Sequence, residues 1–221
     1  MDTRSSSPIS NKPNPSRLLI FFVILYMIVC SFLAYQQGNS EFLMYAIVMV
    51  MFIALAMALH LRIRFSPTAL WLLAIWGLLH MCGGTIPINP QLTDAFRAAS
   101  TTEEQPTSAV LYSLRYFPNF PRYDQLVHTL GFFSATVACY EAVRVLLNAR
   151  RSIPLAIVAI LMGIGLGALN EVIEFIAVLT MPETNVGGYE NTAWDLVANT
   201  IGATIAGLWL HRRQAPDPSE N

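Results

Sequence analysis

The stretch IPLAIVAILMGIGLGALNEVIEFIAVLT, residues 153–180, decides the fold class of this chain. It is apolar for longer than the ~20 residues that a helix needs to cross a bilayer. Its second half nevertheless carries Asn170, Glu171 and Glu174. A charged group at bilayer depth is costly and usually marks a functional site. The stretch therefore predicts a membrane-spanning helix that bears functional polar groups near one end.

Five further apolar runs of similar length occur at residues 18–35, 42–61, 68–86, 126–147 and 192–211. The composition agrees, since 54% of residues are hydrophobic and only 12% are charged. The mean hydropathy is +0.49. We predict an all-α polytopic membrane protein with six transmembrane helices in one domain, residues 17–213. Residues 1–16 are predicted to be a disordered leader that is retained rather than cleaved as a signal, and 214–221 a disordered tail.

The positions of basic residues predict the orientation of the chain, because such residues concentrate in cytoplasmic loops. Ten of them flank the same set of predicted helix ends: Arg4, Lys12, Arg17, Arg62, Arg64, Arg144, Arg150, Arg151, Arg212 and Arg213. Only Arg97, Arg115 and Arg122 fall at the other ends. Both termini are therefore predicted to be cytoplasmic, and the long connection 87–122 to face outward.

Within that outer connection, residues 108–116 place Val110, Leu111 and Leu114 at helical spacing. Such a piece can lie flat on the membrane as an amphipathic helix and cover the bundle as a lid. The alternative is a loop segment that simply packs on the ends of the helices. The sequence does not choose between these two interpretations.

Polar and ionisable residues gather at the outer ends of four predicted helices: His80, Asp124, His128, Asn170, Glu171, Glu174 and Asp195. A spacing of four residues places Asp124 on the same helix face as His128, and Asp195 on the same face as Asn199. Because all these ends lie at one level of the membrane, we predict a single pocket that opens outward.

Local explanations exist for some of these residues. Asp124 and Asp195 can each be the N-terminal cap of a helix, and Glu171 and Glu174 can be solvated acids on a helix end that projects into water. His128 and Asn199 lie too deep for such roles, so they need partners inside the bundle.

The residue types suggest roles within the pocket. Mixed imidazole and carboxylate ligands suit a divalent metal such as Zn, Mn or Fe. The predicted metal ligands are His80, His128, Glu171, Glu174 and Asp195. The predicted catalytic residues are Glu171, His128 and Asp124, with Asp124 orienting His128. Asn170, Trp194 and Asn199 are the predicted ligand-binding residues.

Several other classes of site are disfavoured. A net charge of −1 argues against nucleic acid, which needs a basic surface. The three cysteines lie in different apolar runs and form no disulfide framework or zinc cluster. The glycines of residues 163–168 match a dinucleotide-binding pattern but lie inside an apolar run, so Gly163 and Gly167 are interpreted as a small-residue face for tight helix packing.

Four motifs together carry a family resemblance: Leu79-His80-x-x-Gly83-Gly84, Tyr123-Asp124-x-x-x-His128-x-x-Gly131-Phe132, Asn170-Glu171-x-x-Glu174-Phe175 and Trp194-Asp195-x-x-x-Asn199-x-x-Gly202-Ala203. They resemble the YjdF-like family of bacterial inner-membrane proteins. A looser similarity links the same residues to VanZ-like membrane proteins, a group associated with glycopeptide antibiotic resistance. The resemblance implies a multi-pass protein of the bacterial inner (plasma) membrane without an established reaction.

Three functions remain open at this point. The first is a membrane-embedded enzyme or binding protein whose metal acts on a lipid head group or envelope intermediate. The second is a proton-linked transporter that uses the same carboxylates. The third is a structural or regulatory component in which the polar residues only hold helices together. Membrane lipids are the expected partners in each case, and the sequence leaves the oligomeric state open.

Overall fold

The computed structural model describes residues 15–94, 109–115, 117, 120–181, 184 and 186–212. Six long helices account for most of this part of the chain: α1 (Arg17–Gln36), α2 (Ser40–Ile63), α3 (Pro67–Thr85), α5 (Tyr123–Leu146), α6 (Ile153–Thr180) and α7 (Tyr189–Arg212). The all-α prediction is confirmed. The predicted leader lies almost entirely, and the predicted tail entirely, outside the described residues.

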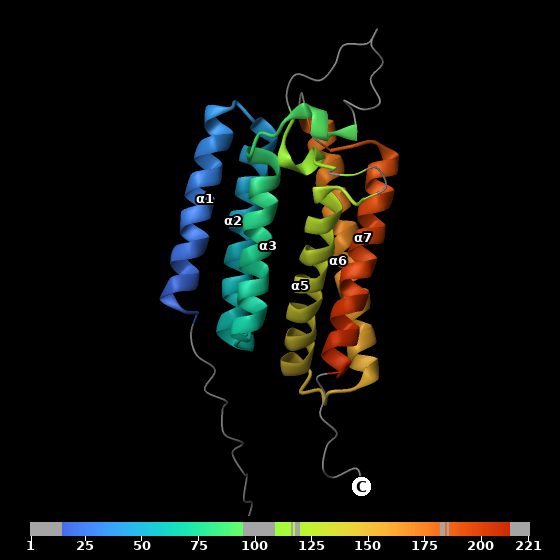
Figure 1. The fold of residues 1–221 in the computed structure, drawn as a ribbon. Coiled ribbons are helices and arrows are strands. Elements are labelled where there is room, and N and C mark those ends of the chain that lie inside the picture. The colour runs from blue at the N-terminus through green and yellow to red at the C-terminus, as the bar shows by residue number, and fades with distance from the viewer. Residues whose placement is uncertain are drawn as a thin grey trace, which may run out of the picture.

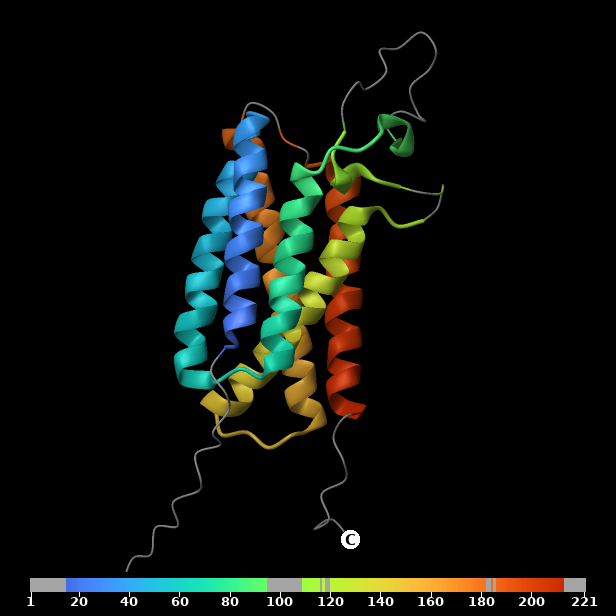
Figure 2. The same cartoon turned by 60° about the vertical axis from the view of Figure 1, so that its left-hand side comes forward.

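The six helices run side by side as two groups of three (Figure 1). Helices α5, α6 and α7 pack against one another, and α3 joins them to α1 and α2 through its contact with α5. Arg17 at the start of α1 and Arg212 at the end of α7 lie at the same end of the bundle, opposite the connection between α3 and α5 (Figure 2). Which compartment each end faces stays a prediction.

Five of the helices, α1, α2, α3, α5 and α6, are long and apolar enough to cross a membrane. Helix α7 is as long as α5 but less apolar, because it carries Glu190, Asp195 and several amides. It buries Asp195 and Asn199 against its neighbours. The predicted sixth span is therefore a helix of the bundle, and its crossing of the membrane stays a prediction.

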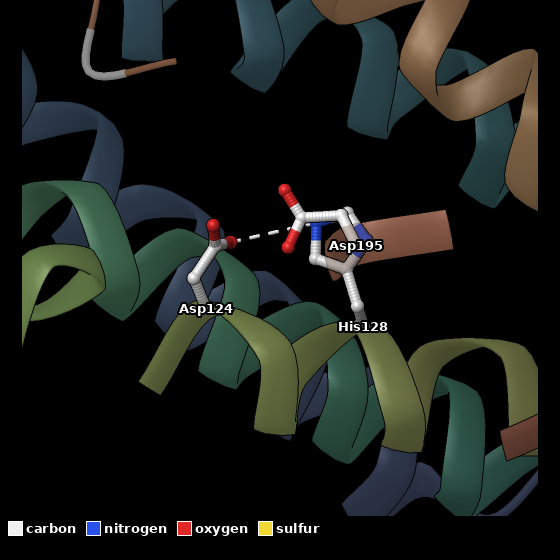
Figure 3. A group of neighbouring side chains, drawn as sticks. All are labelled: Asp124, His128 and Asp195. Carbon is white, nitrogen blue, oxygen red and sulfur yellow. Dashed lines mark ion pairs between the residues drawn. The ribbon is translucent and has the colours of Figure 1, made fainter. Parts of the chain in front are cut away.

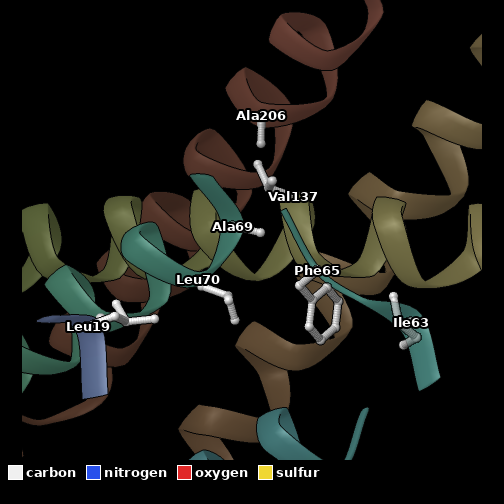
Figure 4. Packing of buried hydrophobic residues seen from close by; sticks show 8 residues of the cluster. Leu19, Ile63, Phe65, Ala69, Leu70, Val137 and Ala206 are labelled. Carbon is white, nitrogen blue, oxygen red and sulfur yellow. The ribbon is translucent and has the colours of Figure 1, made fainter. Parts of the chain in front are cut away.

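A hydrophobic cluster joins the two halves at the end where the described chain begins and ends (Figure 4): Leu19, Ile63, Phe65, Ala69, Leu70, Ala74, Val137 and Ala206. Its members come from α1, α2, α3, α5 and α7 and from the turn between α2 and α3. This cluster packs α1, α2 and α3 against α5 and α7 at the end of the bundle opposite the polar groups.

Two glycines let the helices around the polar residues approach closely. A Cβ added at Gly167 of α6 would lie 2.9 Å from Cβ of Asn199, and one at Gly202 of α7 would meet the backbone carbonyl of Thr129 in α5. Gly163 likewise faces Thr136 and Ala203. The predicted packing face of Gly163 and Gly167 is confirmed, and it is what lets Asn199 reach across to α6.

We expect Gly167→Leu to destabilise the folded protein by about 1–3 kcal/mol, because an added side chain must push Asn199 and α7 away. Gly165→Leu is the matched control, since a Cβ at Gly165 meets nothing within 4 Å. Thermal unfolding in detergent measures both. Equal unfolding temperatures for the two variants would contradict the close contact between α6 and α7.

The described part of the outer connection is not the amphipathic helix that the spacing allowed. Between residues 109 and 115 it forms only the 3-10 turn η2 (Leu111–Ser113) and two isolated bridges, Pro87 with Val110 and Thr93 with Leu114. A second 3-10 turn, η1, covers Pro90–Leu92. Tyr112 of η2 packs on Gly83 at the end of α3. The alternative interpretation, a loop that packs on the bundle ends, is the one the structure shows. Ser108 and Tyr116 lie outside the described residues.

Candidate functional site

His128 of α5 lies at the centre of the polar cluster and is only 6% exposed. Its Nε2 lies 3.4 Å from Oδ1 of Asp124 and 3.6 Å from Oε1 of Glu174. Its Nδ1 lies 3.6 Å from Oε1 of Glu171. Figure 3 shows Asp124 and His128 of α5 together with Asp195 of α7. Three helices thus bring four carboxylates around one imidazole.

Helix α7 contributes two amides that connect these groups. Asn199, 1% exposed, places Oδ1 3.0 Å from Nδ1 of His128 and donates from Nδ2 to Oε1 of Glu171 at 3.3 Å. Asn191 donates to Oδ2 of Asp195 at 2.6 Å and to Oδ2 of Asp124 at 3.1 Å. The spacing of four residues between positions 191, 195 and 199 puts all three side chains on one face of α7.

The amide of Asn199 determines the tautomer of His128. A carboxylate accepts hydrogen bonds, so the Asn199 amide nitrogen faces Glu171 and its oxygen faces His128. That oxygen must then accept from an Nδ1–H. The lone pair of a neutral His128 consequently lies on Nε2, which faces the carboxylates of Asp124 and Glu174.

Three of the four carboxylates share one histidine, His128, as an ion-pair partner. In the described part of the chain, no lysine or arginine forms an ion pair with Asp124, Glu171, Glu174 or Asp195. Two buried carboxylate oxygens, Oε2 of Glu171 and Oδ1 of Asp195, have no hydrogen-bond partner among the described residues. Such groups are costly unless a proton or a cation joins them.

Two sets of ligand atoms lie close enough to hold a metal ion, each within 4.8 Å: Asp124, His128 and Asp195, and His128, Glu171 and Glu174. Two ligands at ~2.1 Å from a tetrahedral ion are separated by about 3.4 Å. The distances from Nε2 to Asp124 and Glu174, 3.4 and 3.6 Å, match that separation and exceed the ~2.8 Å of a charge-assisted hydrogen bond. The residues present therefore fit a divalent ion.

The interpretation of these acids as helix caps or as solvated side chains is mostly wrong in this structure. The cap of α5 is Arg122, and α7 begins at Tyr189, so Asp195 lies in its second turn. Asp195 is fully buried. The side chains of Glu171 and Glu174 are 8% and 17% exposed, which excludes fully solvated acids. Asp124 does lie in the first turn of α5, but its carboxylate contacts His128 and Asn191.

His80 is in neither set of possible metal ligands. Its Nδ1 lies 2.6 Å from the hydroxyl of Tyr112, and its ring stacks on Trp76. Burial raises the pKa of Tyr112 well above its usual value, so the hydroxyl stays protonated and can donate to His80. His80 therefore lies beside the cluster and holds the outer connection to α3.

Of the three predicted ligand-binding residues, the structure brings two to the cluster and leaves one outside it. Asn199 lies inside the cluster, and Asn170 borders it by donating to Oε1 of Glu174 at 2.7 Å. Trp194 is 55% exposed, whereas its neighbour Asp195 is fully buried, so the structure does not bring Trp194 into the cluster.

Sequence reasoning missed the residues that tie the outer connection to the cluster. Arg122 donates from Nη1 to Oδ1 of Asn191 at 2.6 Å and from Nε to Asp94 at 3.0 Å, and Arg115 lies 2.7 Å from the same Asp94 oxygen. The spacing of Asn191 four residues before Asp195 was a usable signal. No pattern in the sequence indicates the pairing of Asp94 with two arginines, because it joins residues distant in the chain.

A small cavity adjoins the cluster between α2, α3 and η2, with a volume of about 30 Å³. Tyr45, His80, Tyr112, Asp124 and Glu174 are among its lining residues. A single water needs about 10–15 Å³ on this measure. The cavity thus has room for one or two waters beside the carboxylates, and a larger molecule would require α2 or η2 to move.

Fold and cluster together define a helical membrane protein with a buried histidine and carboxylate centre. The chain belongs to the family described as predicted membrane protein (DUF2238), whose model matches residues 17–216. This match gives no evidence for the YjdF-like or VanZ-like resemblance. Neither the curated proteins nor the solved structures include a match to this chain.

Proposed function

We propose that this protein binds one divalent metal ion, Zn, Mn or Fe, at the end of the α5, α6 and α7 bundle. Nε2 of His128 and the carboxylates of Asp124 and Asp195 would hold the ion, and Glu171 and Glu174, which form the second possible ligand set with His128, would lie beside it. The single observation that supports this most strongly is that ligand atoms of Asp124, His128 and Asp195 lie within 4.8 Å of one another, with Nε2 of His128 3.4 Å from Oδ1 of Asp124.

The hydrogen bonds behind His128 also support the proposal. A histidine that ligates a metal commonly donates its other N–H to an oxygen that fixes the ring. Asn199 does this for Nδ1, and Glu171 in turn orients the Asn199 amide. Asn191 holds Asp124 and Asp195 at a fixed separation by donating to both. The ligand atoms are thus arranged before any ion arrives.

The wider proposal is a bacterial inner-membrane protein with cytoplasmic termini, whose centre faces outward and acts on a lipid head group or envelope intermediate. A bound divalent ion supplies Lewis acidity and makes a bound water a better nucleophile. Oε2 of Glu171 has no hydrogen-bond partner among the described residues, so this carboxylate oxygen can accept a proton from that water. Head-group release from vesicles of bacterial phospholipid, measured by mass spectrometry and lost in Glu171→Gln, would support this step. Equal release in wild type and variant would reject it.

Elemental analysis of the full chain, purified in detergent without chelator, tests the metal directly. We expect about one transition-metal ion per chain, removed by dialysis against EDTA and restored by adding back the ion. Asp195→Asn keeps the shape of a proposed ligand and removes its charge, so this variant should retain less metal than wild type. A chain that retains no transition metal and takes up none on titration would exclude the metal proposal.

A further inference from the structure

A second, larger cavity lies among α1, α2 and α3, well away from the carboxylates. It has a volume of about 120 Å³, and its lining is almost wholly apolar, with Val23, Ile53, Ala56, Leu70 and Leu73 among the residues. Apolar cavities of roughly 150 Å³ stay dry and take up benzene-sized apolar molecules. This cavity is therefore suited to hydrocarbon and not to water.

The apolar cavity borders a smaller, more polar one of about 20 Å³. This third cavity lies between α2, α3 and α6 and shares Met49, Phe52 and Trp76 with the apolar cavity. At its other side it is lined by Tyr45, His80, Asn170 and Glu174. Trp76 stacks on His80, with ring centroids 5.6 Å apart, so it stands where the lining changes from apolar to polar.

The polar end has hydrogen-bonding capacity that the described residues do not use. Tyr45 is 6% exposed and, like Glu174, lines the polar cavity and the cavity of about 30 Å³ beside the cluster. Its buried hydroxyl has no hydrogen-bond partner among the described residues. Glu174 faces the same space. A group that donates hydrogen bonds, such as a hydroxyl or an amine, would complement both side chains.

We propose that these adjacent cavities bind a short segment of the hydrocarbon chain of a membrane lipid, with a hydrogen-bond-donating head group at Tyr45 and Glu174. This inference rests on the proposed function, because it names the substrate class of the same site. Along α3 the lining runs from His80 to Leu70, about 15 Å of helix. The lining belongs to helices that are apolar enough to cross a membrane, so the cavities lie at the depth of lipid hydrocarbon if these helices span the bilayer.

Fluorescence of Trp76 provides the test. In the full chain carrying Trp71→Phe, Trp194→Phe and Trp209→Phe, Trp76 is the remaining tryptophan. The probe is a monoacylglycerol brominated on its chain, added to nanodiscs of phosphatidylcholine. We expect quenching that saturates at a low mole fraction of probe. Ala56→Phe, which fills the apolar cavity, should weaken the apparent affinity by about tenfold or more. Ala54→Phe is the control, because Ala54 is exposed on α2 and lines neither cavity.

Quenching that rises linearly with probe, or that is the same in Ala56→Phe, would mean contact with surrounding lipid only and would overturn the proposal. If the triple tryptophan variant does not fold, a monoacylglycerol with a diazirine on its chain can be crosslinked to the unmodified chain. The crosslinked residues, located by fragmentation of the labelled peptide, should then be Ile53 and Ala56 in preference to the exposed Leu55. All measurements are repeated in EDTA. Saturable quenching without metal uptake supports the lipid site and rejects the metal, whereas metal uptake without saturable quenching does the reverse.

Discussion

His128→Gln is expected to abolish stable metal binding. The substitution removes Nε2, the only nitrogen among the possible ligands of the centre, and leaves carboxylates that bind a transition ion weakly. The loss of affinity should exceed the roughly 100-fold that removal of an outer hydrogen-bond partner of a ligand causes. Competition titration against a chromophoric chelator measures it.

His80→Gln is the matched control for this prediction. The sequence placed both histidines among the metal ligands, but in the structure His80 pairs with Tyr112 and lies in neither ligand set. We expect its metal affinity to stay within about threefold of wild type, since no ligand is lost. A large loss in His80→Gln together with a small loss in His128→Gln would show that the ion is held elsewhere.

Asn199→Leu is expected to weaken metal binding by about 10–100-fold without removing any ligand. The leucine cannot accept from Nδ1 of His128, so the ring loses the contact that keeps its lone pair on Nε2. Asn199→Asp keeps an oxygen for Nδ1–H and should lose less. The unfolding temperature of each variant, measured without metal, separates this effect from a loss of folding.

If Asn199→Leu and Asn199→Asp bind the ion equally well, the amide does not orient His128 and the assignment of the tautomer is wrong. Thr200→Val serves as a control for substitutions on α7, because Thr200 is exposed and its hydroxyl donates only to its own helix, at Leu196. Its metal affinity should equal that of wild type.

The helices follow from the sequence because each apolar run makes its own backbone hydrogen bonds, whatever its neighbours are. Residues 153–180 show this directly, since the predicted run and α6 have the same bounds. The convergence of Asp124, His128 and Asp195 was also predictable. Spacings of four residues fix which side chains share a helix face, and the polar faces must turn inward. Asn191, four residues before Asp195, shares the same face of α7 by the same spacing.

Only the tertiary structure separates His80 from His128. Both lie near the outer ends of apolar runs, but the position of α3 relative to the cluster depends on packing contacts such as that between Gly131 of α5 and Trp76 of α3. The pairing of Asp94 with Arg122 and the insertion of Tyr112 beside His80 likewise join segments far apart in the chain. Helix formation is local and is determined by the sequence of each segment. The positions of ligand atoms depend on how the segments pack, which no single stretch of residues specifies.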